Sequence, residues 1–519
     1  MTAPRVSVIA LTRDRSEEFL SLLQSLRLQR MRDFEVIVVG AEPTALLHGA
    51  TEDLAERLTY LQCIDQNISM SRNIGLSHAT GEIVAFIDDD RTKVGKKLEG
   101  VDVFNADEAE RLFMRGGVDR VILSIQNLSA ERRRSMVDLA LKHGVRPLDV
   151  PPVDKWINGE LSVGQIRELN IEDLLGRTPI ALSAEAAQSS IEGKRICITG
   201  AAGSIGSEIV RQVLIHRPAA VLAIDQAETP LHDLHVELNR TGSQDAVDLQ
   251  VGDIRDGKQL SETLVAFQPD VVFHAAAYKH VPLMEKQPWQ AFETNVLGTQ
   301  RALRAAIDAG CERFVMISTD KAVNPTSVMG CTKRLAELLV LHEGSKSDVR
   351  CVITRFGNVL GSNGSVIPLF KQQIERGGPI TVTDAEVTRY FMTIPEAVSL
   401  VLEASAIGEK NNVFVFDMGE SVRILDLANK MIALAGMEAG RDIEVVITGL
   451  RPGEKMHEEL LSQRESLLPT HHEKIMRAQT PGTLEPANMT AIAALAEDQG
   501  NHEATRKLLA ELIPEYKGE

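Results

Sequence analysis

The stretch KRICITGAAGSIGSEIVRQVL, residues 194–214, places a glycine-rich turn between an apolar β-branched run and an amphipathic run. Its three glycines lie three residues apart, at Gly200, Gly203 and Gly206. Glycine is needed where a chain turns tightly and where its backbone must approach a pyrophosphate at a helix N-terminus. The stretch therefore predicts a strand, a turn and a helix that bind a dinucleotide, with Ser204 and Ile205 as further contacts.

The acidic end of the next β-branched run, AVLAID, indicates which dinucleotide is bound. Asp225 ends that run about 20 residues beyond the last glycine of the turn. A carboxylate at this place accepts hydrogen bonds from the adenosine ribose hydroxyls and repels a 2′-phosphate, which favours NAD over NADP. The remaining cofactor candidates are Asp253 and Ile254 of GDIRD, Ala275 and Ala276 of FHAAAYKH, Asn295 of ETNVLGT, and Lys333, which is considered below.

The same alternation of apolar runs and helical stretches continues over almost all 519 residues, as in VSVIAL, FEVIVVG, RVILSI, DVVFHAAA and RFVMIST. Such runs between helices predict an α/β fold with parallel sheets that are covered on both faces. The segment 166–194 is richer in polar and turn-forming residues, and we expect it to be a linker that wraps rather than packs.

Composition limits the classes of function. The net charge of −17 argues against a nucleic-acid-binding or anionic-membrane surface. Five scattered cysteines without a Cys-x-x-Cys pair predict a reduced, cytoplasmic protein. Because no uncharged apolar run reaches about 18 residues, we expect no transmembrane segment. His, Cys, Asp and Glu do not cluster at metal-ligand spacing, so we expect no metal.

Motifs beyond the glycine turn carry a specific resemblance. They are STDKAVNP (318–325), TKRLAE (332–337), RFGNVLGSNGSVIPLF (355–370), TRYFMTIPEAV (388–398), LRPGEKMHEEL (450–460) and LIPEY (512–516). Over about 84–519 the chain resembles the UDP-N-acetylglucosamine 4,6-dehydratases of bacterial polysaccharide biosynthesis, which are extended short-chain dehydrogenase/reductases. The resemblance implies a Rossmann-type domain over 195–470, a small substrate-binding subdomain mainly over 360–470, and a helical tail over 471–519. It also implies a homo-oligomer.

The resemblance further implies a reaction on a UDP-sugar. Such enzymes oxidise the C4 hydroxyl with tightly bound NAD, remove water from C5 and C6, and return the hydride to C6, so NAD is regenerated each turnover. By resemblance Thr319 hydrogen-bonds O4, Asp320 protonates the departing C6 hydroxyl and Lys321 takes the C5 proton. An acid needs a raised pKa and a base a lowered one; a dry pocket favours both shifts, whereas the charges of adjacent Asp and Lys oppose both. The division of roles between Asp320 and Lys321 stays open.

Lys333 lies four residues beyond Met329, where most reductases of this class carry Tyr-x-x-x-Lys. There the Tyr accepts the hydroxyl proton, and the Lys binds the nicotinamide ribose and lowers the pKa of the Tyr. A thioether cannot accept that proton. Either the site is inactive or the proton passes to another group. Because one branch of the dehydratases carries Met here, we favour the second interpretation, with Asp320 also acting as the base at the C4 hydroxyl.

Four residues are candidates for the UDP-sugar by resemblance: Asn358, Arg389, Arg451 and Glu454. A guanidinium offers paired donors to phosphate oxygens, which suits the two arginines to the diphosphate. Glu454 could accept hydrogen bonds from the uridine ribose.

The beginning of the chain resembles a different class. Residues 6–90 are similar to the front half of a family-2 GT-A glycosyltransferase, and the stretch FIDDD contains an Asp-x-Asp pair, Asp88 and Asp90. The acceptor half of such an enzyme does not follow; residues 91–165 resemble instead the remainder of the Rossmann-like domain found ahead of dehydratases. We therefore predict a hybrid α/β domain over 1–165 in which the aspartates serve no catalysis.

The sequence leaves three alternatives to the dehydratase open. A UDP-sugar 4-epimerase of the same fold would keep the Tyr and would not need the Thr-Asp-Lys triplet. A non-catalytic sugar-nucleotide-binding protein is supported only by the loss of the Tyr. A glycosyltransferase is opposed by the missing acceptor half.

Overall fold

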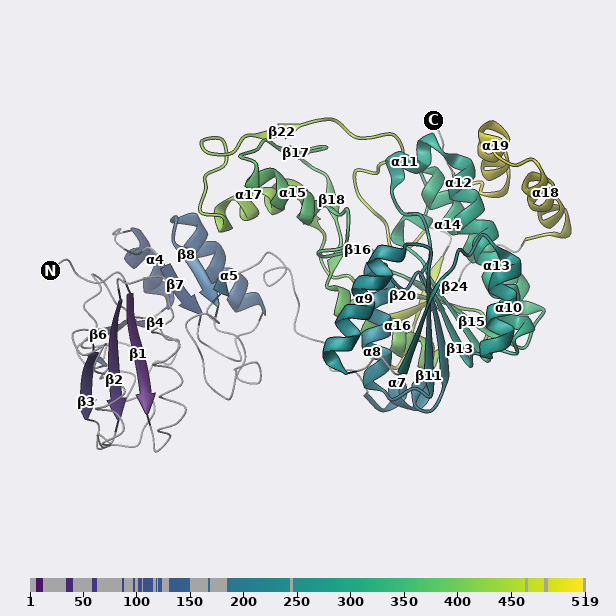
Figure 1. Cartoon of the computed structure of the whole chain (residues 1–519). Coiled ribbons are helices and arrows are strands. Elements are labelled where there is room, and N and C mark those ends of the chain that lie inside the picture. Colours follow the sequence, from purple (N-terminus) through teal and green to yellow (C-terminus); the bar gives the residue numbers. More distant parts are fainter. Residues whose placement is uncertain are drawn as a thin grey trace. The chain divides into compact units, whose positions relative to one another are not determined.

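The computed structural model describes residues 184–242, 246–462, 465–479 and 484–516, together with short elements before residue 184. Its contacts divide the chain into two units, Met1–Asn170 and Ile171–Glu519 (Figure 1).

The described strands of the first unit form three small sheets. The parallel sheet β1-β2-β3 contains two of the predicted runs. Its strands are β1 (Val6–Thr12), β2 (Phe34–Gly40) and β3 (Leu58–Gln62). The others are β4 (Phe86–Ile87), β6 (Val101–Phe104) and β5 (Lys97–Leu98), then β7 (Arg120–Leu123), β8 (Arg146–Asp149) and β9 (Arg167–Glu168), with helices α4 (Ala106–Met114) and α5 (Ala130–Lys142). Asp88 and Asp90 lie outside the described residues.

A nine-stranded sheet organises the second unit, in the order β12-β11-β10-β13-β14-β15-β20-β24-β23. The first seven strands are parallel, and β24 and β23 extend the edge antiparallel. Their bounds are β10 (Arg195–Thr199), β11 (Ala220–Asp225), β12 (Val247–Val251), β13 (Val271–His274), β14 (Arg313–Ile317), β15 (Arg350–Arg355), β20 (Asn412–Phe416), β23 (Ser466–Pro469) and β24 (Ile475–Gln479). The order reverses between β10 and β13, and ligands of open α/β sheets bind outside the strand ends at such a point.

Helices cover both faces of this sheet, as the apolar runs predict (Figure 1). One face carries α7 (Ala184–Ile191), α8 (Ser204–Ile215), α9 (Glu228–Thr241) and α16 (Ile394–Ile407); the other carries α10 (Gly257–Phe267), α13 (Thr299–Asp308) and α14 (Val328–Ser345). Successive side chains of β10 alternate between the two cores: Ile196 and Ile198 pack with α8, and Cys197 packs with α10 and α13.

The structure corrects two predicted boundaries. The range 166–194 is not merely a linker, because α7 packs against α16 and Ile191 is buried in the core. The range 471–519 is not wholly helical, because β24 pairs with β20 before α18 (Pro486–Glu497) and α19 (His502–Leu512) begin. Its apolar residues Ile475 and Ala478 are buried at the sheet edge, which explains the strand.

Smaller elements stand at the carboxyl ends of the strands. They are α11 (Val281–Lys286), α12 (Pro288–Phe292), the π-helix η5 (Glu293–Gly298), the 3₁₀ turn η6 (Asp320–Ala322), α15 (Val366–Glu375), α17 (Ile424–Leu434) and the strand pairs β16 (Asn358–Val359) with β19 (Phe391–Met392), β17 (Ile380–Val382) with β22 (Val445–Ile447), and β18 (Thr388–Arg389) with β21 (Val422–Arg423). Among the described residues, none of the helices is long and apolar enough to cross a membrane.

Candidate active site

The glycine turn between β10 and α8 is built as the sequence predicts. Gly200 has a positive φ of 70°, and a Cβ there would lie 2.5 Å from the backbone nitrogen of Ala276. A Cβ on Gly206 would overlap the carbonyl oxygen of Gly200. At Gly203 a Cβ would meet only that oxygen, at 3.3 Å, so the exposed backbone there is open to a ligand. These are the three demands of a pyrophosphate-binding turn.

Asp225 closes this turn from the end of β11. Its two carboxylate oxygens accept hydrogen bonds from the backbone nitrogens of Ala202, at 3.0 Å, and Ala227, at 2.8 Å. Asp253 is paired with Arg255, whose guanidinium donates to it at 2.6 Å. Burial raises the pKa of Asp253, but the hydrogen bonds from Arg255 outweigh burial and lower it.

A cavity of about 150 Å³ lies against the turn. Seven of the predicted cofactor residues line it: Gly200, Gly203, Asp225, Asp253, Ile254, Ala275 and Ala276. Ser204, Ile205 and Gly206 follow within α8, and Ser204 accepts a hydrogen bond from the backbone of Asn363. Asn295 is fully buried: its amide bonds Tyr278 and Thr332, so it fixes the loop after β13.

Met329 and Lys333, on successive turns of α14, have different surroundings. Met329 is 2% exposed and belongs to an apolar cluster with residues of α12 and α19. Lys333 donates a hydrogen bond from Nζ to the carbonyl oxygen of Ile317 at 2.7 Å, and burial lowers its pKa to about 8. Met329, at the Tyr position, therefore packs in the core, whereas Lys333 contacts the end of β14, the strand that precedes the triplet.

The triplet Thr319-Asp320-Lys321 follows β14 and begins η6. The Thr319 hydroxyl donates to Oδ1 of Asp320 at 2.8 Å, and Nζ of Lys321 donates to the same oxygen at 3.0 Å. The Asp320 side chain is fully buried, and its Oδ2 has no hydrogen-bond partner among the described residues. A buried carboxylate oxygen without a partner costs free energy. Asp320 is linked to the neighbouring cavity through its hydrogen bond with Lys321, which lines that cavity.

Lys321 carries its proton in this arrangement and is not a neutral amine. Burial alone lowers its pKa, but Asp320 and Glu458 raise it above the usual value for lysine. The two carboxylates therefore affect the pKa of Lys321 more than burial does, and Lys321 is held as an ammonium group.

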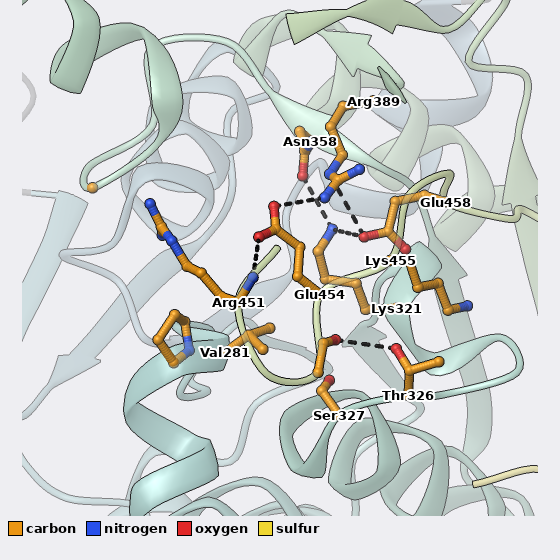
Figure 2. Close-up of a pocket in the computed structure, with 13 residues that line it drawn as sticks. Val281, Lys321, Thr326, Ser327, Asn358, Arg389, Arg451, Glu454, Lys455 and Glu458 are labelled. Atoms are coloured by element: carbon orange, nitrogen blue, oxygen red, sulfur yellow. Dashed lines mark hydrogen bonds and ion pairs between the residues drawn. The ribbon is translucent and has the colours of Figure 1, made fainter. Parts of the chain in front are cut away.

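A second cavity, of about 230 Å³, contains Lys321 and all four predicted substrate residues (Figure 2). Asn358 Oδ1 accepts a hydrogen bond from Lys321 at 3.1 Å. Arg389 is largely committed to the protein: it donates to Glu454 at 2.9 Å and to the carbonyls of Thr388 and Met456. The Arg451 side chain is exposed, and its guanidinium makes no hydrogen bond within the described part of the chain, which leaves its donors available.

The loop that carries Arg451 and Glu454 is tied to the start of α14. Thr326 donates a hydrogen bond to the Gly453 carbonyl at 3.1 Å. Gly453 has a φ of 75°, and a Cβ there would lie 2.8 Å from the Cβ of Ser327. The loop therefore approaches α14 more closely than any residue with a side chain allows.

Two features of the site are not predicted from the sequence. Glu458 lines the cavity with its Oε1 3.4 Å from Nζ of Lys321 and 3.8 Å from Nε of Arg389. It lies in the quoted stretch LRPGEKMHEEL, but nothing in that stretch shows which of its acidic side chains turns inward. Behind the triplet is a buried network: Ser318 donates to Glu337 at 2.6 Å, and Arg355 bridges Glu337 and Glu465.

That network fixes the strand ends that hold the triplet. Burial raises the pKa of Glu337, but Arg355 and Arg334 outweigh it and lower the value to about 2, so the carboxylate is ionised. A buried pair of this kind is weak evidence for stability, but removing one partner leaves an uncompensated buried charge.

The sheet order, the glycine turn and the strand-end cavities define a Rossmann-type fold of the extended short-chain dehydrogenase/reductase class. The family model described as "Polysaccharide biosynthesis protein" matches residues 196–480, which is more than half of the chain. The chain therefore belongs to this polysaccharide biosynthesis family. A second model, "Glycosyl transferase family 2", matches residues 7–100.

Named relatives agree with this family. The "Probable polysaccharide biosynthesis protein EpsC" of Bacillus subtilis is 43% identical over 74% of this chain and 64% of its own length. The "Capsular polysaccharide biosynthesis protein CapD" of Staphylococcus aureus is 41% identical over 82% of this chain and 71% of its own. This chain thus spans less than two thirds of the length of the Bacillus subtilis relative.

Two further comparisons bear on the reaction and the fold. A "UDP-glucose 4-epimerase" of Rickettsia canadensis is 35% identical over 52% of this chain and 79% of its own. The crystal structure of Pen from Bacillus thuringiensis superposes with a TM-score of 0.51 at 32% identity, over 56% of this chain and 91% of that one. The relatives thus include a protein named as a sugar-nucleotide epimerase and two named for polysaccharide biosynthesis, and these names do not separate dehydratase from epimerase.

Proposed function

We propose that the protein is a NAD-dependent UDP-N-acetylglucosamine 4,6-dehydratase of bacterial polysaccharide biosynthesis. The observation that carries this proposal is the cavity that joins Lys321, and through it the buried Asp320, to Arg451, Arg389 and Glu454. Removal of water from a sugar needs proton-transfer groups at the reacting carbons and donors that hold the nucleotide diphosphate. The cavity offers both kinds of group.

The residues around the glycine turn fit NAD. The Cβ-excluding positions at Gly200 and Gly206 and the open backbone at Gly203 suit a pyrophosphate, and Asp225 suits an unphosphorylated adenosine ribose. When bound, NAD would supply the acceptor for the C4 hydride and its donor at C6. Lys333, whose Nζ already bonds the end of β14, is the candidate for the nicotinamide ribose.

The remaining chemistry falls to the triplet. Thr319 hydrogen-bonds O4, and the free Oδ2 of Asp320 accepts the C4 hydroxyl proton and later gives it to the departing C6 hydroxyl. This double role replaces the Tyr whose position Met329 fills. Lys321 takes the C5 proton, which the C4 ketone makes acidic. Arg451 binds the diphosphate, with Arg389 oriented by Glu454 beside it.

The test is to incubate the purified protein with UDP-N-acetylglucosamine and follow the sugar by NMR. A 4-keto-6-deoxy product supports the proposal. Unchanged substrate would indicate a non-catalytic sugar-nucleotide-binding protein. Release of UDP would indicate glycosyl transfer.

An epimerase is the second candidate, because the Rickettsia canadensis relative carries that name. An epimerase exchanges the configuration at C4 and has no use for a base at C5, whereas the cavity contains Lys321 with three oxygen partners. In the same NMR experiment, a C4-inverted sugar with an intact C6 hydroxyl would identify the epimerase.

A further inference from the structure

Glu458 is a buried carboxylate in the substrate cavity to which the proposed chemistry assigns no part. Its side chain is 3% exposed, its Oε1 lies 3.4 Å from Nζ of Lys321, and its Oε2 has no hydrogen-bond partner among the described residues. Figure 2 shows it on the opposite side of Lys321 from the Arg451 backbone, beside Arg389. Most buried side-chain polar atoms have a hydrogen-bond partner, so an unpartnered carboxylate oxygen on a residue that lines a cavity requires an explanation.

The proposed function creates a need for such a group. To take the C5 proton, Lys321 must first be a neutral amine, yet Asp320 and Glu458 hold it as an ammonium group. A lysine enclosed with its substrate has to pass one proton to a neighbour. Asp320 is already the carrier between the C4 and C6 oxygens and therefore cannot store a second proton at that stage.

We propose that Glu458 holds the proton of Lys321 while Lys321 acts as the base at C5. The inference rests on the proposed dehydratase function. One proton moves from Nζ to the Glu458 carboxylate, which gives an amine beside a carboxylic acid and leaves the net charge unchanged. The amine then takes the C5 proton; the C–H electrons form the C5–C6 double bond, and the C6 hydroxyl leaves as water with the proton of Asp320. When Lys321 returns its proton to C5, Glu458 restores the ammonium group.

Arg389 gives Glu458 its second charged neighbour. Its Nε lies 3.8 Å from Oε1, and its other donors are held by Glu454 and by backbone carbonyls. Glu458 is therefore held between Arg389 and Lys321 of the triplet. It acts through Lys321 and is a positioning and proton-holding residue.

A partial reaction isolates this step. The 4-keto-6-deoxy product has an acidic C5–H, and exchange of that proton in deuterated water needs the base but no hydride transfer. The intact protein is incubated with the UDP-4-keto-6-deoxy-N-acetylhexosamine, and loss of the C5 proton signal is followed by NMR. The variant is Glu458→Gln, with Glu458→Asp as a conservative partner. Glu312→Gln is the matched control, because Glu312 pairs with Lys194 at 3.0 Å outside the cavity.

We expect Glu458→Gln to slow C5 exchange and kcat by about 10²-fold, a typical size for a proton-transfer group, with KM and UDP binding little changed. Glu458→Asp should recover part of the exchange, and Glu312→Gln should match the unaltered protein. Exchange within about threefold of the unaltered protein in Glu458→Gln would overturn the inference. So would loss of UDP binding in that variant, because the role of Glu458 would then be to organise Arg389. If the unaltered protein makes no 4-keto product and catalyses no exchange, the proposed function itself fails.

Discussion

Lys321 has three oxygen partners, from Asp320, Asn358 and Glu458, although it is itself part of the proposed chemistry. Each partner fixes the position of Nζ, and the two carboxylates also stabilise its proton. Positioning and basicity thus compete at one atom. This is why the neighbours of Lys321, and not its identity alone, decide what it can do.

Replacing Lys321 by Ala should abolish dehydration. We expect a loss of about 10²–10⁴-fold in kcat, the usual contribution of one positioned proton-transfer group, while UDP still binds through Arg451 and its loop. Product formation by NMR and UDP binding by calorimetry measure the two effects. Lys194→Ala removes a lysine paired with Glu312 at the surface and should leave both unchanged. A loss of less than tenfold in Lys321→Ala would remove Lys321 from the proposed role.

The sequence singles out seven of the thirteen residues that line the cavity at the glycine turn and five of the thirteen that line the other cavity, but it does not show how these residues pair. Gly200 and Asp225 are predicted from a local strand–turn–helix motif, because their proposed roles depend on the backbone around them, whereas Arg451 is predicted from the family resemblance. The inward turn of Glu458 depends on the loop 450–460 meeting α14, which is a tertiary contact. Likewise, the sequence shows that Met329 stands at the Tyr position, and only the structure shows that α12 and α19 enclose it.

At the scale of elements, substitutions at two glycines of the turn between β10 and α8 should affect different properties, one the stability of the fold and the other the binding of NAD. Gly206→Ala should destabilise the protein, because its Cβ would overlap the Gly200 carbonyl. Gly203→Ala should destabilise the protein much less, because the Gly200 oxygen at 3.3 Å would have to shift by only a few tenths of an ångström. It should still lose NAD affinity, because the backbone can no longer approach the pyrophosphate. Thermal unfolding and NAD titration of both variants check this. Equal NAD affinity in Gly203→Ala and the unaltered protein would contradict the assignment of the turn.

His274, at the end of β13, should make the free energy of unfolding depend on pH. Its ring nitrogens bond the hydroxyls of Thr199 at 2.7 Å and Thr299 at 2.9 Å, and burial, with a smaller effect of Lys333, lowers its pKa to about 3 from 6.5. Above pH 6.5 the ring is neutral in the folded and unfolded chains. As the pH falls from 6.5 towards 3, only the unfolded chain gains the proton, so the free energy of unfolding decreases.

The expected slope from His274 is at most about 1.4 kcal/mol per pH unit in that window. His274→Asn should be less stable at neutral pH, because it loses hydrogen bonds, and should show a shallower decline below pH 6.5. Urea unfolding of both proteins across the window measures the difference. Parallel curves would show that His274 does not titrate as its burial implies.

At the scale of the whole chain, the alternation of strands and helices predicts the large sheet and its covered faces, because burial on both faces leaves continuous apolar runs. Boundaries are harder to predict. The polar composition of 166–194 hides α7, whose Ile191 enters the core, and β24 is recognisable only once β20 stands beside it. The division between Asn170 and Ile171 also falls inside the range that composition assigns to a linker.

The beginning of the chain is expected to contribute no chemistry of its own. The match to the glycosyltransferase model covers residues 7–100, and a glycosyltransferase needs both a donor-metal site and an acceptor half. The double variant Asp88→Asn/Asp90→Asn should therefore keep dehydration and NAD binding at the level of the unaltered protein. Manganese-dependent sugar transfer to an acceptor that disappears in the double variant would show a second, independent activity.

In the proposed reaction, the hydride removed from C4 of the sugar is returned at C6. The most direct measurement uses UDP-N-acetylglucosamine deuterated at C4, with the product analysed by NMR and mass spectrometry. The product should be a 4-keto sugar whose C6 methyl group carries the deuterium. Deuterium retained at an inverted C4, with the C6 hydroxyl intact, would contradict it and identify an epimerase.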